Sequence, residues 1–331
     1  MGISTVTLSI IIVNYNCLDL VVNCLESFEE YAPSVDYEII VVNNDSNVDL
    51  FFESLRNQKN VKLVQNTGNW GFSSGCNLGA QSASGNYYLF LNPDTRLNDT
   101  RAIDQMIELM QSDNQIGACG CRTVTKRGIG NELSWTNPWL LIGWIRAIHG
   151  LLYRSKIDSL FAEDKDIWFP EFVGGSAIMF NASDYMKIGG WSADKFWMYC
   201  EDSDICYRIG RLLGKKVALI RNASINHISG GASKVDSNSK LMLKLELIIS
   251  THNYIYHNSN SISRFIILPM YILKSSVPTI IKLFISLLLY NRKKIYKYKY
   301  LTLGITKYYL SCISRRTWRS LKIDQQQSKD W

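Results

Sequence analysis

The stretch YYLFLNPD, residues 87–94, decides the fold. Its five apolar residues predict a buried strand, and Pro93 ends that strand because proline cannot donate to a central ladder. Asp94 is thereby fixed at the carboxyl end of a strand, where open α/β sheets bind their ligands. A carboxylate placed in this way suits a divalent cation that bridges a diphosphate. Because an Asn-Pro-Asp sequence is also common in plain turns, the stretch alone leaves that simpler interpretation open.

Strands and helices alternate on both sides of this stretch. Apolar runs predict further strands at 8–13, 37–42, 61–64, 116–124, 172–180 and 216–220. Helical spacing or small-residue composition predicts helices near 18–28, 50–55, 75–84, 101–110 and 201–213. This order predicts an α/β fold in which helices cover both faces of a doubly wound, mainly parallel sheet.

The length of 331 residues allows one large or two modest domains. We expect one α/β domain over residues 1–240 and a basic, apolar, helical region over 241–331. Residues 126–170 interrupt the strand and helix rhythm and are rich in tryptophan and basic residues. They predict an insertion that covers a cleft or forms a lid, and a core subdomain is the alternative.

Cysteine and histidine usage gives no sign of a zinc site or a disulfide framework. The eight cysteines form no CxxC pair, and the four histidines are scattered. A reduced, cytosolic setting is therefore expected. The apolar run 8–13 follows no basic residue, so it predicts a first strand and not a signal peptide.

The net charge of +7 is concentrated near the C-terminus. Residues 247–323 contain thirteen Lys and Arg and no acidic residue, which points to an anionic partner. Residues 262–290 are strongly apolar, but two lysines and two prolines interrupt them and argue against a spanning helix. Basic residues and tyrosines alternate directly afterwards, which predicts an in-plane membrane contact. A helical cap with a solvated basic face is the alternative, and no nucleic-acid module accompanies the charge.

Two polar clusters follow predicted strands. Asn43 and Asp45 follow the strand at 37–42, where a side-chain amide can pair with a uracil or thymine. A capped turn explains the same residues equally well. In the segment 69–72, Asn-Trp-Gly-Phe, glycine would let backbone N–H groups approach a phosphate at a helix start. Neither a Walker loop nor a GxGxxG fingerprint is present.

The segment EDSDICYR, residues 201–208, contains the last cluster of candidate catalytic residues. Asp204 and Arg208 are spaced to pair on one helix face. Glu201 and Asp202 would then project from the first helical turn, although carboxylates there can also serve only as caps. A single histidine, His227, follows late in the chain, and a lone histidine is more often structural than a ligand.

These motifs, together with Gly189-Gly190-Trp191, resemble those of family 2 glycosyltransferases, and they are most similar to the rhamnosyltransferase-like group. The resemblance covers residues 7–235 in the correct order. It implies a GT-A fold, a nucleotide-diphosphate sugar donor and a divalent metal, Mg²⁺ or Mn²⁺.

The resemblance also implies roles for single residues. Asp94 matches the last acid of the family's DxD metal motif, and His227 matches a late metal-ligating histidine. Asp202 matches the catalytic base, beside Glu201, and Arg208 matches a motif arginine near the active centre. The residues expected to bind the donor are Asn14, Asn43, Asp45, Asn69, Phe72, Asn77 and Asn92.

The sequence departs from the family pattern at two places. Asn92 and Pro93 occupy the first two positions of the DxD motif, so the metal would depend on one carboxylate. Asn43 stands where an acid is usual, and Asp45 follows two places later, so either residue could read the base.

The implied activity is inverting sugar transfer, with rhamnose from dTDP-rhamnose as the first expectation. The product would belong to a cell-surface polysaccharide of the O-antigen or capsule type. The alternatives are a UDP-linked donor (galactofuranose, glucose or GlcNAc), a nucleotidyltransferase, or a non-catalytic scaffold. The basic tail, together with what the resemblance implies about acceptors in this family, suggests a polyprenyl-diphosphate-linked acceptor at the cytoplasmic face of the cell membrane. No nucleic-acid partner is expected.

Overall fold

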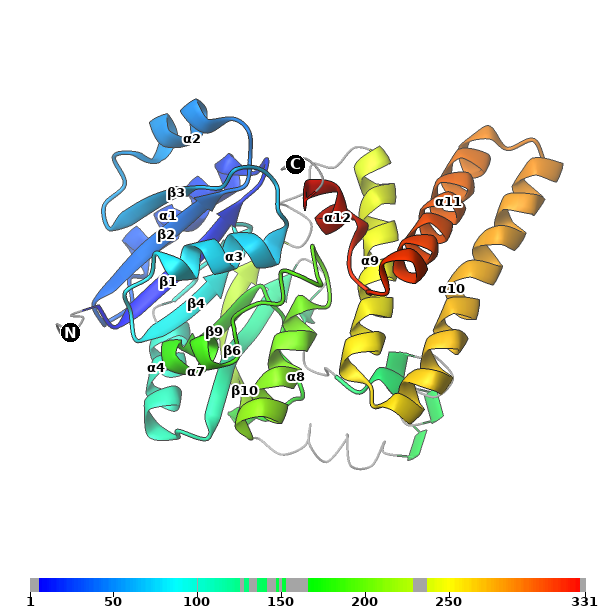
Figure 1. Cartoon of the computed structure of the whole chain (residues 1–331). Coiled ribbons are helices and arrows are strands. Elements are labelled where there is room, and N and C mark those ends of the chain that lie inside the picture. Colours follow the sequence, from blue (N-terminus) through cyan, green and yellow to red (C-terminus); the bar gives the residue numbers. More distant parts are fainter. Residues whose placement is uncertain are drawn as a thin grey trace. The chain divides into compact units, whose positions relative to one another are not determined.

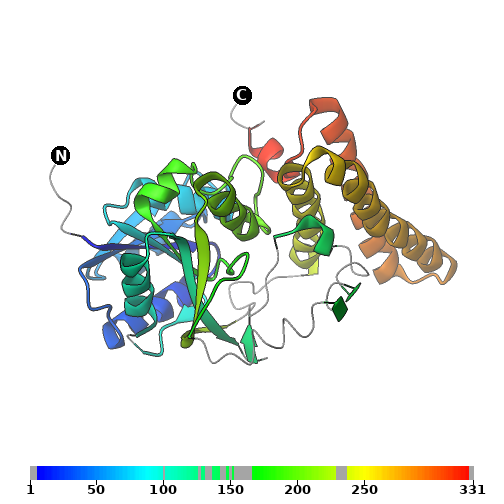
Figure 2. The same cartoon turned by 90° about the horizontal axis from the view of Figure 1, so that it is seen from below.

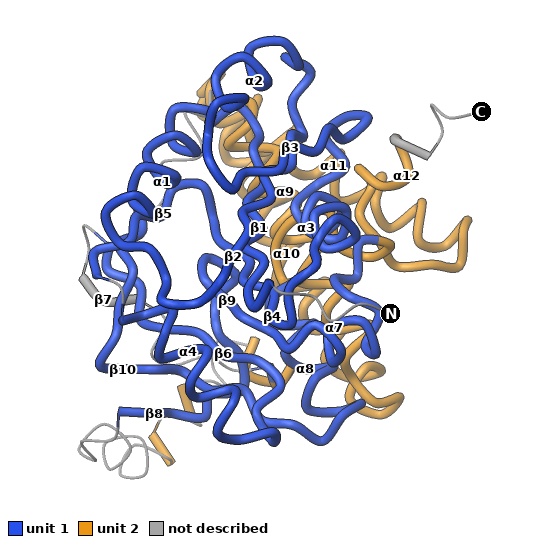
Figure 3. The backbone as a smooth tube through the Cα atoms, turned by 90° about the vertical axis from the view of Figure 1, so that its left-hand side faces the viewer, with its two compact units in different colours: residues 1–136, 163–193, 201–234 blue, residues 137–162, 194–200, 235–331 orange. Residues whose placement is uncertain are grey.

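The computed structural model describes residues 6–99, 101–125, 128–130, 136–141, 147–148, 151–152, 166–228 and 237–327. Most of the insertion expected at 126–170 lies outside these residues. The chain forms two compact units (Figure 3). Unit 1 comprises residues 1–136, 163–193 and 201–234, and unit 2 comprises 137–162, 194–200 and 235–331.

Unit 1 is built on one mixed sheet. Its strands, in spatial order, are β3 (Val61–Gln65), β2 (Tyr37–Asn43), β1 (Leu8–Asn14), β4 (Tyr87–Leu91), β9 (Ala177–Asn181), β6 (Ile116–Thr125), β10 (Lys216–His227) and β5 (Thr95–Arg96). Two short strands, β7 (Gly128–Gly130) and β8 (Ile167–Trp168), pair with β6 and β10. The predicted α/β class is confirmed (Figure 1).

One central strand departs from the predicted parallel order, as do the short strands β5, β7 and β8 at the margin of the sheet. The pairs β1–β2, β2–β3, β1–β4 and β6–β10 are parallel, whereas β9 lies between β4 and β6 and is antiparallel to both. A parallel strand would need a crossover that returns the chain to the opposite edge of the sheet. Residues 174–176 instead lead directly into β9 at the edge where β4 ends. The start of β9 therefore joins the carboxyl ends of its neighbours.

Helices cover both faces of the sheet because successive strand residues point to opposite sides (Figure 1). On one face, Ile10 and Ile12 join a core with the helices α1 (Leu18–Glu30), α2 (Val48–Leu55) and α4 (Arg101–Ser112). The other face carries the helices α3 (Phe72–Gln81), α7 (Ala182–Lys187) and α8 (Glu201–Leu213). A Cβ at Gly79 would lie 2.5 Å from Ile11 Cγ2, so α3 can approach the sheet only with glycine there.

Unit 2 is helical in the part of the chain that the structure describes (Figure 2). Its elements are the 3₁₀ turn η1 (Pro138–Leu141) and the helices α9 (Ser237–Asn258), α10 (Ser261–Leu288), α11 (Arg292–Arg315) and α12 (Leu321–Gln327). Leu245 and Ile249 of α9 pack with Leu301 and Ile305 of α11, and α10 packs against both helices. Among the described helices, α10 is long and apolar enough to be a candidate membrane span, which the sequence analysis argues against.

All eight cysteines are free thiols, and seven of them are buried. Burial raises the pKa of Cys17, which precedes α1, to about 11, so this thiol is protonated at neutral pH.

Candidate active site

Most of the residues singled out in the sequence meet at one edge of the sheet. Asn14 ends β1, Asn43 ends β2, and His227 ends β10. Asp94 follows β4 after a short turn. Because these strands run in the same direction, their carboxyl ends lie together, at the edge where α/β sheets bind ligands.

Asp94 and His227 are in direct contact although 133 residues separate them. The antiparallel pairing of β10 with β5 places His227 opposite Thr95, the residue after Asp94. His227 Nε2 lies 3.1 Å from Asp94 Oδ1, and the backbone N–H of Ile228 donates to the carbonyl of Asp94. Asp94 is only 4% exposed. The register of two strands therefore brings the two predicted metal ligands together.

The pair is chemically suited to a divalent cation that shares its ligands with a substrate. Among the described residues, no cluster of three or more His, Cys, Asp or Glu side chains forms a complete protein cage. Mg²⁺ commonly takes one or two protein carboxylates and completes its octahedron with substrate phosphates and water. One buried carboxylate with an adjacent imidazole fits that arrangement.

The choice between Asn43 and Asp45 is informed by their hydrogen bonds. Asn43 Oδ1 accepts from Asn14 Nδ2 at 2.8 Å and from the backbone N–H of Asp45 at 3.1 Å. Asn43 Nδ2 donates to Gln65 Oε1 at 2.9 Å and to the carbonyl of Asp45 at 3.3 Å. Asn43 is fully buried, so its amide is committed to joining the ends of β1, β2 and β3.

Asp45 is placed differently. With Asn14, Leu18 and Phe51 among its neighbours, it lines an open cavity of about 340 Å³ at the carboxyl end of β1 and β2. Its carboxylate accepts only a long bond of 3.4 Å from the backbone N–H of Asn47 and another from Ser46. The geometry therefore favours Asp45 over Asn43 as the group that meets a ligand.

The remaining candidate donor-binding residues lie in the turns around α3 and β4. Asn69 Oδ1 accepts from the N–H of Gly71, which precedes α3. The ring of Phe72, the first residue of α3, packs edge-on against Trp191 with centroids 5.7 Å apart. The backbone N–H of Asn92 donates to the carbonyl of Ser176. These contacts shape the turns, and the ligand contacts of the three residues remain predictions.

Asp202 lies in the first turn of α8, half-buried, with two backbone donors on its carboxylate. Gly175 N–H donates to Oδ2 at 3.3 Å, and Ser203 N–H donates to Oδ1 at 2.7 Å. Burial raises the pKa of Asp202, and these hydrogen bonds counteract only part of that rise. A carboxylate with a raised pKa is a stronger base than an ordinary aspartate, as general-base catalysis requires. Glu201, beside it, is buried.

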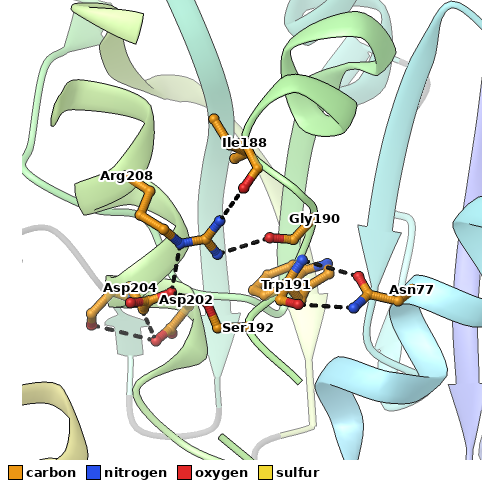
Figure 4. Close-up of polar contacts among 9 residues, drawn as sticks. Asn77, Ile188, Gly190, Trp191, Ser192, Asp202, Asp204 and Arg208 are labelled. Atoms are coloured by element: carbon orange, nitrogen blue, oxygen red, sulfur yellow. Dashed lines mark hydrogen bonds and ion pairs between the residues drawn. The ribbon is translucent and has the colours of Figure 1, made fainter. Parts of the chain in front are cut away.

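Arg208 and Asn77 bind the turn formed by residues 188–191 from opposite sides (Figure 4). Arg208 Nε donates to Asp204 Oδ2 at 2.8 Å, and its other nitrogens donate to the carbonyls of Ile188 and Gly190 at 2.9 and 2.8 Å. Asn77 accepts from Trp191 N–H at 3.0 Å and donates to the Trp191 carbonyl at 2.8 Å. We infer that both residues position the turn, whereas the sequence analysis assigns Arg208 to catalysis and Asn77 to the donor.

Gly190 is the tightest position of this turn, which gives a test of its importance. Its φ is +68°, and a Cβ there would lie 2.7 Å from Asn77 Oδ1. Gly214 has a φ of +66° and nothing within 4 Å of such a Cβ. We expect Gly214→Ala to cost about 1 kcal/mol of unfolding free energy from backbone strain. Gly190→Ala should cost about 2–4 kcal/mol, because overpacking adds to the strain.

Urea unfolding of the two alanine variants checks this expectation. Equal losses of stability would show that the contact with Asn77 does not constrain the turn.

Two residues of the site, Gly175 and Gln65, are not identified as site residues from the sequence. Gly175 is noticed only as part of a strand, yet its amide binds Asp202. Gln65 ends β3 and bonds to the amide of Asn43. A polar residue at the end of a predicted strand is the signal that could have identified Gln65. The Gly175 contact depends on the antiparallel entry of β9, which the sequence does not reveal.

Comparisons with known proteins agree with this geometry. The model of the family "Glycosyl transferase family 2" matches residues 9–161. The low-salt glycan biosynthesis hexosyltransferase Agl10 of Haloferax volcanii is 27% identical over 210 residues, which are 62% of each protein. The match thus spans less than two thirds of that relative. The dolichyl-phosphate beta-glucosyltransferase ALG5A of Trichomonas vaginalis is 24% identical over 75% of each protein.

A solved structure shows the same fold. The mannosyltransferase PcManGT from Pyrobaculum calidifontis superimposes with a TM-score of 0.51 at 15% identity, covering 91% of this chain and 86% of that one. At this identity the likeness concerns the fold alone. The matching family model, the relatives and the α/β architecture agree: this chain has a GT-A fold, and its residues 9–161 match glycosyl transferase family 2.

Proposed function

We propose that this chain is an inverting glycosyltransferase that moves one sugar from a nucleotide-diphosphate donor to an acceptor hydroxyl. The observation that carries the proposal is the arrangement at one sheet edge: Asp202, a base with a raised pKa, shares this edge with the Asp94–His227 pair. A transferase needs a base for the acceptor and a positive charge for the departing diphosphate. A scaffold protein would need neither.

In the proposed reaction, Asp202 accepts the proton of the acceptor hydroxyl while that oxygen bonds to the anomeric carbon. The bond from the anomeric carbon to the phosphate oxygen breaks at the same time, and the nucleoside diphosphate leaves. The Gly175 and Ser203 amides hold the carboxylate in place. Attack opposite the leaving group inverts the anomeric configuration, so no second carboxylate is needed as a nucleophile, unlike in retaining hydrolysis.

Asp94, with His227 beside it, would hold a divalent cation, Mg²⁺ or Mn²⁺. Such an ion neutralises charge that develops on a departing diphosphate. The structure of PcManGT contains GDP-mannose and Mn²⁺, which supports this part of the proposal.

Two candidate donors are proposed. Asp45 lines the cavity beside Asn14, where a nucleobase could meet its carboxylate. The rhamnosyltransferase-like motifs make dTDP-rhamnose the first candidate. The second candidate is a UDP-linked sugar, and the names of the relatives, a hexosyltransferase and a beta-glucosyltransferase, support glucose or another hexose as that sugar. They give no support to nucleotidyl transfer.

The acceptor is proposed to be a polyprenyl-diphosphate-linked glycan in cell-surface polysaccharide synthesis, at the cytoplasmic face of the cell membrane. The relative ALG5A is named for dolichyl phosphate, another lipid-linked phosphate. Residues 1–240 would bind the donor and catalyse transfer. The insertion 126–170 would cover the acceptor side, and residues 241–331 would keep the enzyme at the membrane.

A thermal-shift screen tests the proposed donor. The full chain is heated with dTDP-rhamnose, UDP-glucose, UDP-GlcNAc or GDP-mannose, each with and without Mn²⁺. A ligand that binds the native state raises its stability by mass action. Selective, Mn²⁺-dependent stabilisation by dTDP-rhamnose would support rhamnosyl transfer, and stabilisation by a UDP-sugar alone would replace that donor. No shift with any donor would contradict the proposal.

A further inference from the structure

The helix α10 presents a continuous apolar stripe to solvent. Its outward positions recur every three or four residues along the whole helix, at Ile262, Phe265, Pro269, Leu273, Val277, Ile280, Phe284 and Leu288. Phe265 is 83% exposed, Leu273 60% and Phe284 61%. At 1.5 Å per residue, the 28-residue helix gives a stripe about 42 Å long. A soluble monomer rarely exposes so long a contiguous apolar surface.

The covered side of α10 is mixed: Ile267 and Leu268 pack into a small apolar cluster near the start of the helix, and hydroxyl groups occupy the covered side farther along. Thr279 and Ser286 are buried, and each bonds to the carbonyl four residues earlier, at 2.7 and 2.5 Å. Ser275 does the same at 2.9 Å, and its hydroxyl also lies 3.2 Å from His252 Nε2 of α9. A helix of a soluble protein turns its apolar side inward. Small hydroxyl residues between helices, with apolar side chains outside, are typical of helices in contact with lipid.

Basic residues flank the stripe at its C-terminal end. Arg292, Lys293 and Lys294 begin α11 and are exposed, and Lys282 is exposed one turn and a half before the end of α10. No acidic residue occurs between Glu246 and Asp324 to offset them. An apolar stripe beside uncompensated cationic groups complements a surface of acyl chains and anionic headgroups.

We propose that α10 lies in the plane of an anionic lipid leaflet, with its apolar stripe among the acyl chains and Lys282, Arg292, Lys293 and Lys294 at the lipid phosphates. The inference deepens the proposed function, because it names the surface by which the enzyme would reach a lipid-linked acceptor.

The packing of α11 argues for the in-plane arrangement over a membrane crossing. α11 turns back after Leu288 and packs along α10 as a helical hairpin. If α10 crossed the bilayer, α11 would have to follow it, and Lys297, Lys299 and Lys307 would enter the hydrocarbon. Each of those charges would be costly there.

Vesicle flotation of the full chain without any donor tests the proposal. The wild type should float with phosphatidylcholine vesicles that contain phosphatidylglycerol and bind vesicles of phosphatidylcholine alone far more weakly. Leu273→Glu should weaken binding about tenfold or more, because a charge would enter the acyl region. The matched control is Leu212→Glu on α8, where the native leucine is 59% exposed and which should float like the wild type.

A charge-matched pair tests the basic flank. Arg292→Gln with Lys293→Gln should weaken binding about 10- to 30-fold, since each basic group near an anionic surface contributes about fivefold. Arg56→Gln with Lys59→Gln removes the same two charges from exposed positions in unit 1 and should have little effect. Equal losses in the two double variants would mean that net charge alone attracts the protein, which would overturn the assignment of the lipid site.

Labels on cysteines introduced at Ile262, Leu273 and Phe284 distinguish the two membrane arrangements. Quenching by lipids brominated at known depths should place all three labels at one shallow depth. A graded series of depths would replace the in-plane arrangement by a crossing. Wild-type protein that stays off both vesicles, or that dimerises through this stripe, would overturn the proposal. Metal-dependent donor binding in the same preparation would then show that the proposed activity survives this failure.

Discussion

The Asp202→Asn variant is expected to lose about 10²- to 10⁴-fold in kcat, the usual contribution of general-base catalysis. An amide keeps the shape of the side chain but cannot accept the acceptor proton. The single oxygen of the amide can keep the 2.7 Å bond from the Ser203 N–H, and only the longer 3.3 Å bond from the Gly175 N–H is lost, so the local fold should survive. Donor binding, measured by thermal shift with Mn²⁺, should stay within a factor of a few of the wild type.

The pH dependence of the wild type provides an independent check of this role. Because burial raises the pKa of Asp202, the catalytic carboxylate is protonated, and activity lost, at a higher pH than for an ordinary aspartate. The acid limb of kcat/KM should therefore disappear from the residual activity of Asp202→Asn. Asp49→Asn, at an exposed position on α2, is the control and should leave rate and profile unchanged. Transfer at the wild-type rate by Asp202→Asn would remove Asp202 from the reaction.

The Asp94→Asn variant is expected to lose at least about 10²-fold in kcat/KM, because metal charge stabilisation is worth several kcal/mol. The change removes the buried charge and keeps the size of the side chain beside His227. The readout that separates a metal role from a structural one is the Mn²⁺ titration of donor binding. It should shift to much higher Mn²⁺ in Asp94→Asn and stay unchanged in Asp49→Asn. An unshifted titration would exclude Asp94 as a ligand.

Much of the fold can be predicted from the sequence because its strands are strongly patterned. The run at 87–91 is buried on both faces, so its residues are apolar without interruption, and Pro93 marks its end. The strand register that brings His227 to Asp94 is harder to predict from the sequence. It depends on the antiparallel pairing of β10 with the two-residue strand β5. Such a short strand leaves no periodic pattern in the sequence.

The roles of single polar residues are harder to predict, because spacing does not reveal which groups a side chain contacts. Asn43 and Asp45 both follow the same strand, and only the hydrogen bonds show that Asn43 is committed to Asn14 and Gln65. Arg208 has the expected helical partner, Asp204. The carbonyls that it also binds come from a turn whose two glycines have positive φ.

The C-terminal region shows the same limit on a larger scale. Its apolar and basic composition is plain in the sequence and already suggests a membrane contact. Which side of α10 stays uncovered depends on how α9 and α11 pack against it. The hydroxyl groups of Thr279 and Ser286 on the covered side become informative only when that packing is known.

The most direct test of the account is to identify both products of one reaction. The enzyme is incubated with Mn²⁺, the donor selected by thermal shift, and a polyprenyl-diphosphate-linked sugar, and NMR follows the anomeric configuration. The account predicts release of a nucleoside diphosphate together with a new glycosidic bond of inverted configuration. Retention of configuration would contradict the role of Asp202, and release of inorganic diphosphate from a nucleoside triphosphate would contradict glycosyl transfer itself.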